Sequence, residues 1–275
     1  MKQFISKSVF FPIGFLFATT MAVQAHLPFI APQSYVVDGN STSVLAGFAE
    51  IPFASEVALR GFSVHLTTPE KTITPLTLNS NKAIAIADIE AKTAGTYRID
   101  ATRDNTLEYV QVGKKWLRVM DSKASDLKPL AERNFILPSE ITAKMKKVTH
   151  IRHEQLLTFF SKEKISNEVL TPNSDGLAVA FSQHPNTLQH GQTLTLSLSA
   201  QAKAQAGLEV ITVKQLTHVD EKEVELKQTT DQKGNVVLAF PQSGQYFIQI
   251  NSPTVADTVQ PAAQSYRLHL AVQVN

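Results

Sequence analysis

The most specific chemistry in this sequence is offered by His26, which follows a pattern typical of an export-signal cleavage site. Val23 and Ala25 supply the small residues three positions and one position before the expected cut. Cleavage there makes His26 the first mature residue, with a free α-amino group beside its imidazole ring. These two nitrogens form a chelate that suits copper(II), nickel(II) or zinc(II). A third nitrogen would complete a histidine brace, and His65 is a candidate because it is expected on the polar face of a strand.

Two further histidines, His150 and His153, lie three residues apart in a charged segment. On a helix they would share a face, whereas on a strand they would point to opposite faces. The apolar run at 156–160 favours a strand, which weakens a site made from the pair. Either histidine alone could still reach the N-terminal histidine across a sheet. The alternative is a solvated strand end in which Arg152 and Glu154 form an ion pair.

The four remaining histidines carry a weaker chemical signal. His184 and His190 lie around a Pro-Asn pair and fit turn positions. His218 stands beside acidic residues, as at a hairpin tip, and His269 alternates with leucines like a surface residue of a strand. The candidate metal ligands are therefore His26, His65, His150 and His153.

The first 25 residues have the three parts of a secretory signal peptide. Two lysines and no acid in residues 1–8 precede an apolar run at 9–18. That run is shorter than the roughly 20 residues of a membrane span. We therefore expect a periplasmic protein without a membrane span in its mature form.

Charge and cysteine content exclude several classes of partner and stabilisation. The chain has 26 Lys and Arg against 24 Asp and Glu, and removing Lys2 and Lys7 with the signal leaves 24 against 24. A mature charge of zero gives no argument for nucleic acid or an anionic membrane surface as a partner. The absence of cysteine excludes disulfides and a lipid-attachment thiol.

Short alternating segments separated by turn signals predict an all-β fold of antiparallel sandwiches. In the segment 62–67, Phe62, Val64 and Leu66 share one face, which leaves His65 on the other. A Gly-x-Tyr strand in each half, at 95–97 and 244–246, is compatible with two similar modules. The predicted organisation is a signal peptide at 1–25, an N-terminal sandwich at 26–120, a connecting segment at 121–175 with one strand and a short helix between Pro138 and Lys147, and a C-terminal Ig-like sandwich at 176–275.

The sequence lacks the common motifs of catalysis. It has no Gly-rich phosphate loop, no Gly-x-Ser-x-Gly, no His-Glu-x-x-His and no cysteine nucleophile. Its carboxylates show no pairing that suggests acid–base catalysis. We therefore expect no enzymatic activity and no organic cofactor.

A series of turn and strand residues resembles a known family. These residues are Gly176-Leu177, His184-Pro185-Asn186, Leu188, Gly191, Gly207-Leu208-Glu209-Val210, Thr230-Asp231, Gly234 and Phe240-Pro241-x-x-Gly244-x-Tyr246. Together with Ala25-His26, they resemble the domain-of-unknown-function 4198 family (DUF4198). The resemblance implies periplasmic β-sandwich domains connected with nickel or cobalt uptake, and only His26 carries over as a functional residue. Family members often have a Tyr-x-Arg strand with a nearby lysine. This chain has His150-Ile151-Arg152-His153-Glu154 there instead, which puts a shared mid-chain site in doubt.

Three functions fit these features. The first is a periplasmic protein that binds a transition-metal ion (nickel, cobalt, copper or zinc) through His26 and keeps it or delivers it to a membrane uptake system. The alternative is a non-catalytic β-sandwich interaction module of the cell envelope. A histidine-brace copper enzyme ranks last, because aromatic residues for substrate binding are sparse.

Overall fold

The computed structural model describes residues 26–122, 127–171, 176–217 and 224–275, which form three β-sheets. The strands of the large sheet are β2 (Val36–Val37), β5 (Ser63–Thr67), β6 (Ile73–Pro75), β9 (Gly95–Val112), β10 (Lys115–Val119), β11 (Phe135–Ile136), β12 (Lys147–Lys162), β16 (Glu209–Lys214), β17 (Glu225–Thr229), β19 (Gly244–Asn251) and β20 (Gln264–Val274). A second sheet holds β1 (Leu27–Pro32), β3 (Ser41–Ala49), β4 (Val57–Ala58), β7 (Asn79–Ser80) and β8 (Ala85–Glu90). The third holds β13 (Ala178–Phe181), β14 (Thr193–Ala200), β15 (Lys203–Ala204) and β18 (Asn235–Ala239).

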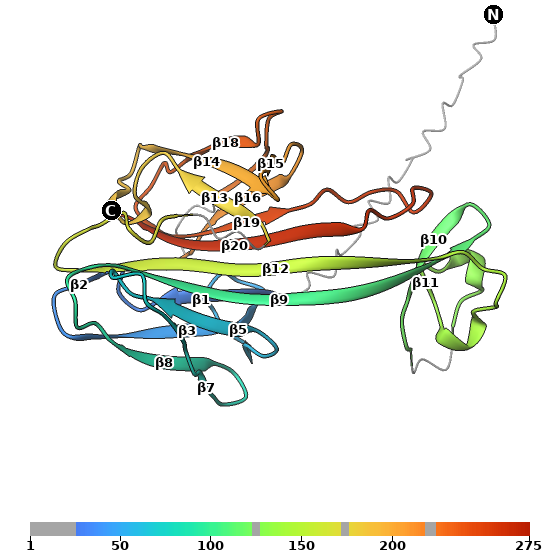
Figure 1. Ribbon diagram of the computed structural model, residues 1–275, viewed down its shortest axis with the longest axis horizontal. Helices are drawn as coiled ribbons and strands as arrows, with labels where there is room; N and C mark the ends of the chain where they lie inside the picture. Colours follow the sequence, from blue (N-terminus) through green and yellow to red (C-terminus); the bar gives the residue numbers. More distant parts are fainter. Residues whose placement is uncertain (1–25, 123–126, 172–175, 218–223) are drawn as a thin grey trace, which may run out of the picture.

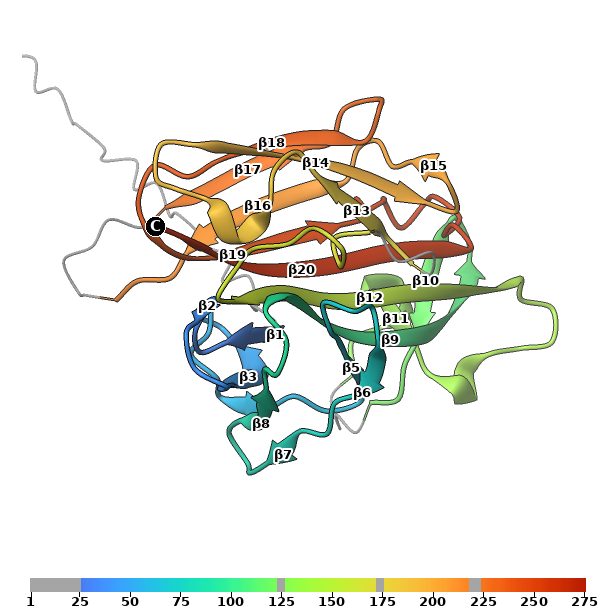
Figure 2. The same cartoon turned by 60° about the vertical axis from the view of Figure 1, so that its left-hand side comes forward.

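The large sheet lies between the two smaller ones (Figure 1, Figure 2). Its main path runs β11-β10-β9-β12-β20-β19-β16-β17. The sheet that contains β1 covers one face, and the sheet that contains β14 covers the other. The predicted all-β fold of two antiparallel Ig-like sandwiches is therefore confirmed, and the two sandwiches share the large sheet.

Strand β12 contributes side chains to the hydrophobic cores of both sandwiches. Leu156 and Phe160 belong to the N-terminal hydrophobic core, whereas Leu157 and Phe159 belong to the C-terminal core. A strand covered on both faces needs apolar residues at successive positions, which explains why residues 156–160 are apolar except for Thr158. The segment expected to connect the modules thus supplies their common central strand. It pairs with β9 in antiparallel and with β20 in parallel orientation.

Strands β9 and β12 extend together beyond the sandwiches, and β10 and β11 join them at the far end (Figure 1). A small core of Val110, Leu117 and Ile136 holds this extension together. The predicted hairpin at 107–119 turns at Gly113, whose φ of 61° suits glycine.

The helical content near this extension is smaller than the sequence suggested. The described residues contain three single 3₁₀ turns: η1 (Leu130–Glu132) and η2 (Pro138–Glu140) near this extension, and η3 (Pro185–Thr187) before β14. The short helix expected between Pro138 and Lys147 is thus only η2, because the chain turns extended at Ile141 and enters β12 soon afterwards. Within the described ranges, no helix has the length and hydrophobicity needed to cross a membrane.

Candidate metal centre

His26 lies beside two glutamates at the start of the first strand. Its Nε2 is 2.9 Å from Oε2 of Glu56 and 4.0 Å from Oε1 of Glu50. One ligand atom from each of the three residues lies within 4.8 Å of the others. In the described part of the chain, this is the one group of three or more histidine and acidic side chains with that spacing. The group therefore has the donor atoms and the proximity that a bound metal ion requires.

Pairing between β1 and β3 brings the three residues together. Leu27 lies opposite Ala49, so His26, which precedes Leu27, and Glu50, which follows Ala49, lie at the same end of the strand pair. Glu56 is returned to this position by a turn, in which its backbone N–H donates to the Phe48 carbonyl at 3.0 Å.

An aromatic side chain fixes that turn. The ring of Phe53 packs edge-to-face against Phe29 at 5.6 Å and Phe247 at 5.8 Å between centroids. Phe53 has a φ of 66°, which is unfavourable for a residue with a bulky side chain. Packing of this partly buried ring against the core offsets the strain and holds Glu50 and Glu56 on either side of the turn.

The carboxylate of Glu56 is held in its charged form. A hydrogen bond from the Glu50 backbone N–H lowers the pKa of Glu56, and the hydrogen bond to His26 lowers it further. All three side chains are about half exposed, so an ion can reach them from solvent. Coordination through Nε2 would replace the hydrogen bond between His26 and Glu56, because a ring nitrogen that binds a metal ion carries no proton.

His65 and His153 lie in a different place, a groove of about 1130 Å³ along the large sheet. His65 faces away from its strand's core, as predicted, and lies opposite Asp100 on β9. Nδ1 of His153 is 2.8 Å from Asp104, and its ring stacks on Tyr266 at 5.5 Å. The structure thus brings these two histidines to one groove, whereas the close ionic contacts of His26 are with Glu50 and Glu56.

His150 has both ring nitrogens engaged by protein groups. Nδ1 lies 2.6 Å from the Ala262 carbonyl, and Nε2 lies 2.7 Å from the Ser265 hydroxyl. Because β12 is a strand, His150 and His153 point to opposite faces, as the sequence interpretation required. His150 could bind a metal ion only if one of these two hydrogen bonds were broken.

The four remaining histidines were predicted to lie in turns or on the surface of a strand. His184 precedes η3, and its Nδ1 accepts from the Asn186 backbone N–H, so it is a turn residue. His190 is exposed in the following turn. His218 lies outside the described residues.

The prediction that His269 is a surface residue was wrong. Its side chain is 1% exposed, because β1 covers the face of β20 from which it projects. Nδ1 of His269 lies 2.7 Å from the Pro28 carbonyl, which requires the ring to donate there. Nε2 is buried without a partner in the described part of the chain.

Acid should destabilise the protein through His269. Burial lowers its pKa from 6.5 to about 4, although the hydrogen bond to Pro28 opposes this shift. The unfolded chain therefore binds a proton that the folded chain excludes as the pH falls below about 6.5. We expect a stability loss on the order of 3 kcal/mol between pH 7 and pH 4 from this residue. In urea unfolding, the His269→Gln variant should lose less free energy of unfolding between pH 7 and pH 4 than the wild type. An identical pH profile for wild type and variant would contradict this expectation.

Sequence reasoning missed Glu50 and Glu56. Both were visible as acids that bracket a Pro-Phe turn after a predicted strand. The missing information was the register between that strand and the N-terminal segment, which decides whether the acids meet His26.

Comparison with known proteins identifies one family. The family model described as "Domain of unknown function (DUF4198)" matches residues 23–253. No curated protein matches the sequence.

Several solved structures align with the chain at low similarity. The D0–D1 domain of intimin has 12% identity and a TM-score of 0.21, covering 89% of this chain and 97% of its own. A DUF4785 family protein from Legionella pneumophila has 9% identity and a TM-score of 0.23, covering 80% of this chain and 50% of its own. A segment of two fibronectin type III domains from chicken tenascin has 10% identity and a TM-score of 0.23, covering 90% of this chain and 99% of its own. Scores this low indicate nothing about the function of the chain.

Proposed function

This chain belongs to the DUF4198 family, and we propose that it is a periplasmic protein that binds a divalent transition-metal ion at His26, Glu50 and Glu56. The observation that carries the proposal is the approach of the imidazole and the two carboxylates to within 4.8 Å of one another. The bound ion is held or delivered to a membrane uptake system. Nickel and cobalt are the first candidates, followed by copper and zinc.

The donor set supports an ion of intermediate hardness. One imidazole nitrogen and two carboxylate oxygens bind Zn²⁺, Ni²⁺ and Co²⁺ in proteins. Cleavage after Ala25 would add the α-amino nitrogen of His26 and give two nitrogen and two oxygen ligands. The amino group has a reference pKa near 8, so its deprotonation for binding is accessible near neutral pH.

The alternatives have less support. A histidine brace needs a second imidazole beside His26, and the ligand group around it in the described residues contains carboxylates instead. If the N-terminal histidine has only a structural role, the interaction module becomes the function, and no contact among the described residues specifically favours that function.

Metal binding can be tested by calorimetry with nickel, cobalt, copper and zinc on protein that begins at His26. We expect one ion to bind at micromolar affinity or tighter. His26→Ala should weaken binding at least about 100-fold, and Glu56→Gln about tenfold, because each loses one ligand. One extra residue before His26 should also weaken binding if the amino group is a ligand.

His190→Ala is the matched control, since it removes an exposed histidine in the turn before β14, outside the ligand group, and should leave the affinity unchanged. Binding that is absent, or equal in wild type and His26→Ala, would disprove the metal proposal. The interaction-module hypothesis would then take first place.

A further inference from the structure

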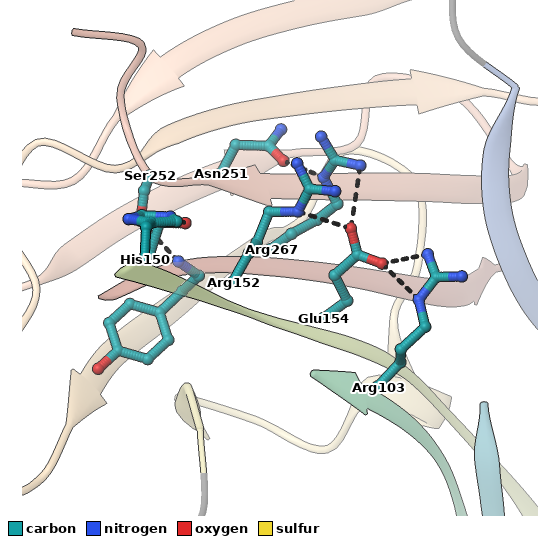
Figure 3. A network of polar contacts seen from close by, with 9 residues as sticks. Arg103, His150, Arg152, Glu154, Asn251, Ser252 and Arg267 are labelled. Carbon is teal, nitrogen blue, oxygen red and sulfur yellow. Dashed lines mark hydrogen bonds and ion pairs between the residues drawn. The ribbon is translucent and has the colours of Figure 1, made fainter. Parts of the chain in front are cut away.

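A cluster of three arginines surrounds one buried carboxylate on the large sheet (Figure 3). Glu154 on β12 lies opposite Arg103 of β9 on one side and Arg267 of β20 on the other. Arg152 precedes Glu154 by two residues and projects from the same face of the strand. The Glu154 side chain is 1% exposed, whereas the three arginine side chains are 27–33% exposed.

Glu154 does not use up the hydrogen-bonding capacity of the arginines. Arg103 donates from Nε at 2.9 Å and also from Nη2, both to Oε2 of Glu154. Arg267 reaches the other carboxylate oxygen only at 3.4 Å. The Arg152 side chain makes no hydrogen bond in the described part of the chain, although its Nε lies 2.9 Å from Oε1 of Glu154 as an ion pair.

The cluster therefore has an excess of positive charge. Three guanidinium charges against one carboxylate charge leave two positive charges on adjacent strands. Burial lowers the pKa of Arg267, and the charge of Arg152 lowers it further. Burial by itself would raise the pKa of Glu154, but the hydrogen bond from Arg103 and the three nearby charges lower it. Glu154 thus stays charged and still leaves the guanidinium groups short of negative partners.

Elsewhere on the same sheet, one arginine and one carboxylate form an ion pair whose charges balance. Arg98 binds Asp100 through Nε at 2.9 Å and Nη2 at 2.6 Å, and its Nη1 donates to the Thr171 carbonyl at 2.8 Å. Both side chains of that pair are about 10% exposed. The arginines around Glu154 differ because they outnumber the acid and because their side chains are 27–33% exposed.

We propose that Arg103, Arg152 and Arg267 form a binding site for a dianionic oxyanion, namely inorganic phosphate or a phosphoryl group on a larger molecule. Guanidinium groups bind such oxygens through paired N–H donors, and two negative charges would balance the cluster. Two neighbours fix the donors in place: the Phe62 ring lies 4.3 Å from the Arg103 guanidinium carbon, and Asn251 accepts from Arg267.

The groove beside the arginines has room for a ligand larger than inorganic phosphate. Arg103, Glu154 and Arg267 line the groove of about 1130 Å³ that also contains His65 and His153. A phosphoryl group could therefore carry an attached organic part along the groove. The site is separate in composition from the proposed metal centre, since they share no residue.

The test is calorimetry and thermal unfolding of the full mature chain with inorganic phosphate, against chloride at equal ionic strength. We expect phosphate to bind and to raise the unfolding temperature beyond the effect of chloride. Arg152→Gln and Arg267→Gln should each weaken phosphate binding about tenfold, the scale of a lost charge-assisted contact. Arg152→Lys keeps the charge, provides a second variant if the glutamine variant folds poorly, and should have an intermediate affinity.

Lys114→Gln is the charge-matched control, because it removes an exposed positive charge at the distant β9–β10 turn. His26→Ala should keep phosphate binding, so this proposal and the metal proposal can fail independently. A parallel titration with glycerol phosphate distinguishes the sources: binding of both ligands indicates a phosphoryl group on a larger molecule, and binding of phosphate alone indicates the free ion. Equal effects of phosphate and chloride, or equal losses in Lys114→Gln and Arg152→Gln, would overturn the proposal and leave a structural ion-pair network.

Discussion

Replacing Glu154 with glutamine is expected to lower the free energy of unfolding by about 3 kcal/mol. The substitution keeps the size of a side chain that is 1% exposed but removes the negative charge between Arg103, Arg152 and Arg267. Losing one partner of a buried ion pair typically costs about 3–5 kcal/mol. We expect the lower end because the arginine side chains are 27–33% exposed and water can solvate them after the change.

The pH dependence identifies the cause of this effect. The folded protein lowers the pKa of Glu154, so the stabilisation is present above the pKa of an unfolded glutamate, about 4.3, and is lost as the pH falls through the lower folded value. Urea unfolding should therefore show a large difference between wild type and Glu154→Gln at pH 7 and a smaller one below pH 4. Glu108→Gln, an exposed change on β9, should stay within about 0.5 kcal/mol of wild type. A difference that is independent of pH would mean that lost packing, rather than lost charge, is responsible.

Truncating either aromatic residue of β12 is expected to destabilise the whole chain. Phe160 is fully buried and stacks on Tyr97 at 4.7 Å in the N-terminal core, whereas Phe159 is 1% exposed in the C-terminal core. A buried Phe→Ala change costs about 3–5 kcal/mol. Because the two residues are neighbours on one strand, each variant should lower the stability of both sandwiches together.

Calorimetric unfolding of Phe159→Ala and Phe160→Ala tests this coupling. We expect one transition in the wild type and one transition, at lower temperature, in each variant. The exposed β18 residue Val237 provides a control, and Val237→Ala should have little effect. Two separate transitions, each shifted by only one of the phenylalanine variants, would show that the sandwiches unfold independently.

Much of the fold could be predicted from local pattern because most strands have one buried face. Alternation placed β5 correctly, including the direction of His65. The role of β12 could not be predicted in this way. Its apolar run indicated a strand, but only long-range packing determines that Leu156 and Leu157 enter different cores. The same limit explains His269, whose alternation with leucines looked like a surface pattern although β1 covers that face.

The candidate site was predictable only in part. The chemistry of His26 follows from its place after the expected cleavage motif and needs no fold. Its neighbours Glu50 and Glu56 depend on the register of β1 with β3 and on a turn fixed by Phe53. A local pattern does not specify strand register between segments separated by a loop. The arginine cluster was hidden for the same reason, since its members come from three strands that are far apart in sequence.

The pairing of β12 also constrains the order in which the protein can fold. Its antiparallel neighbour β9 precedes it, but its parallel neighbour β20 follows much later, with Thr158 and Ala271 separated by 113 positions. Contacts between such distant segments form slowly. Until β20 arrives, residues 151–158 of β12 have one edge of unpaired backbone groups. A chain interrupted before residue 264 would keep this edge open and be prone to aggregation, so the large sheet can be completed only after β20 has emerged.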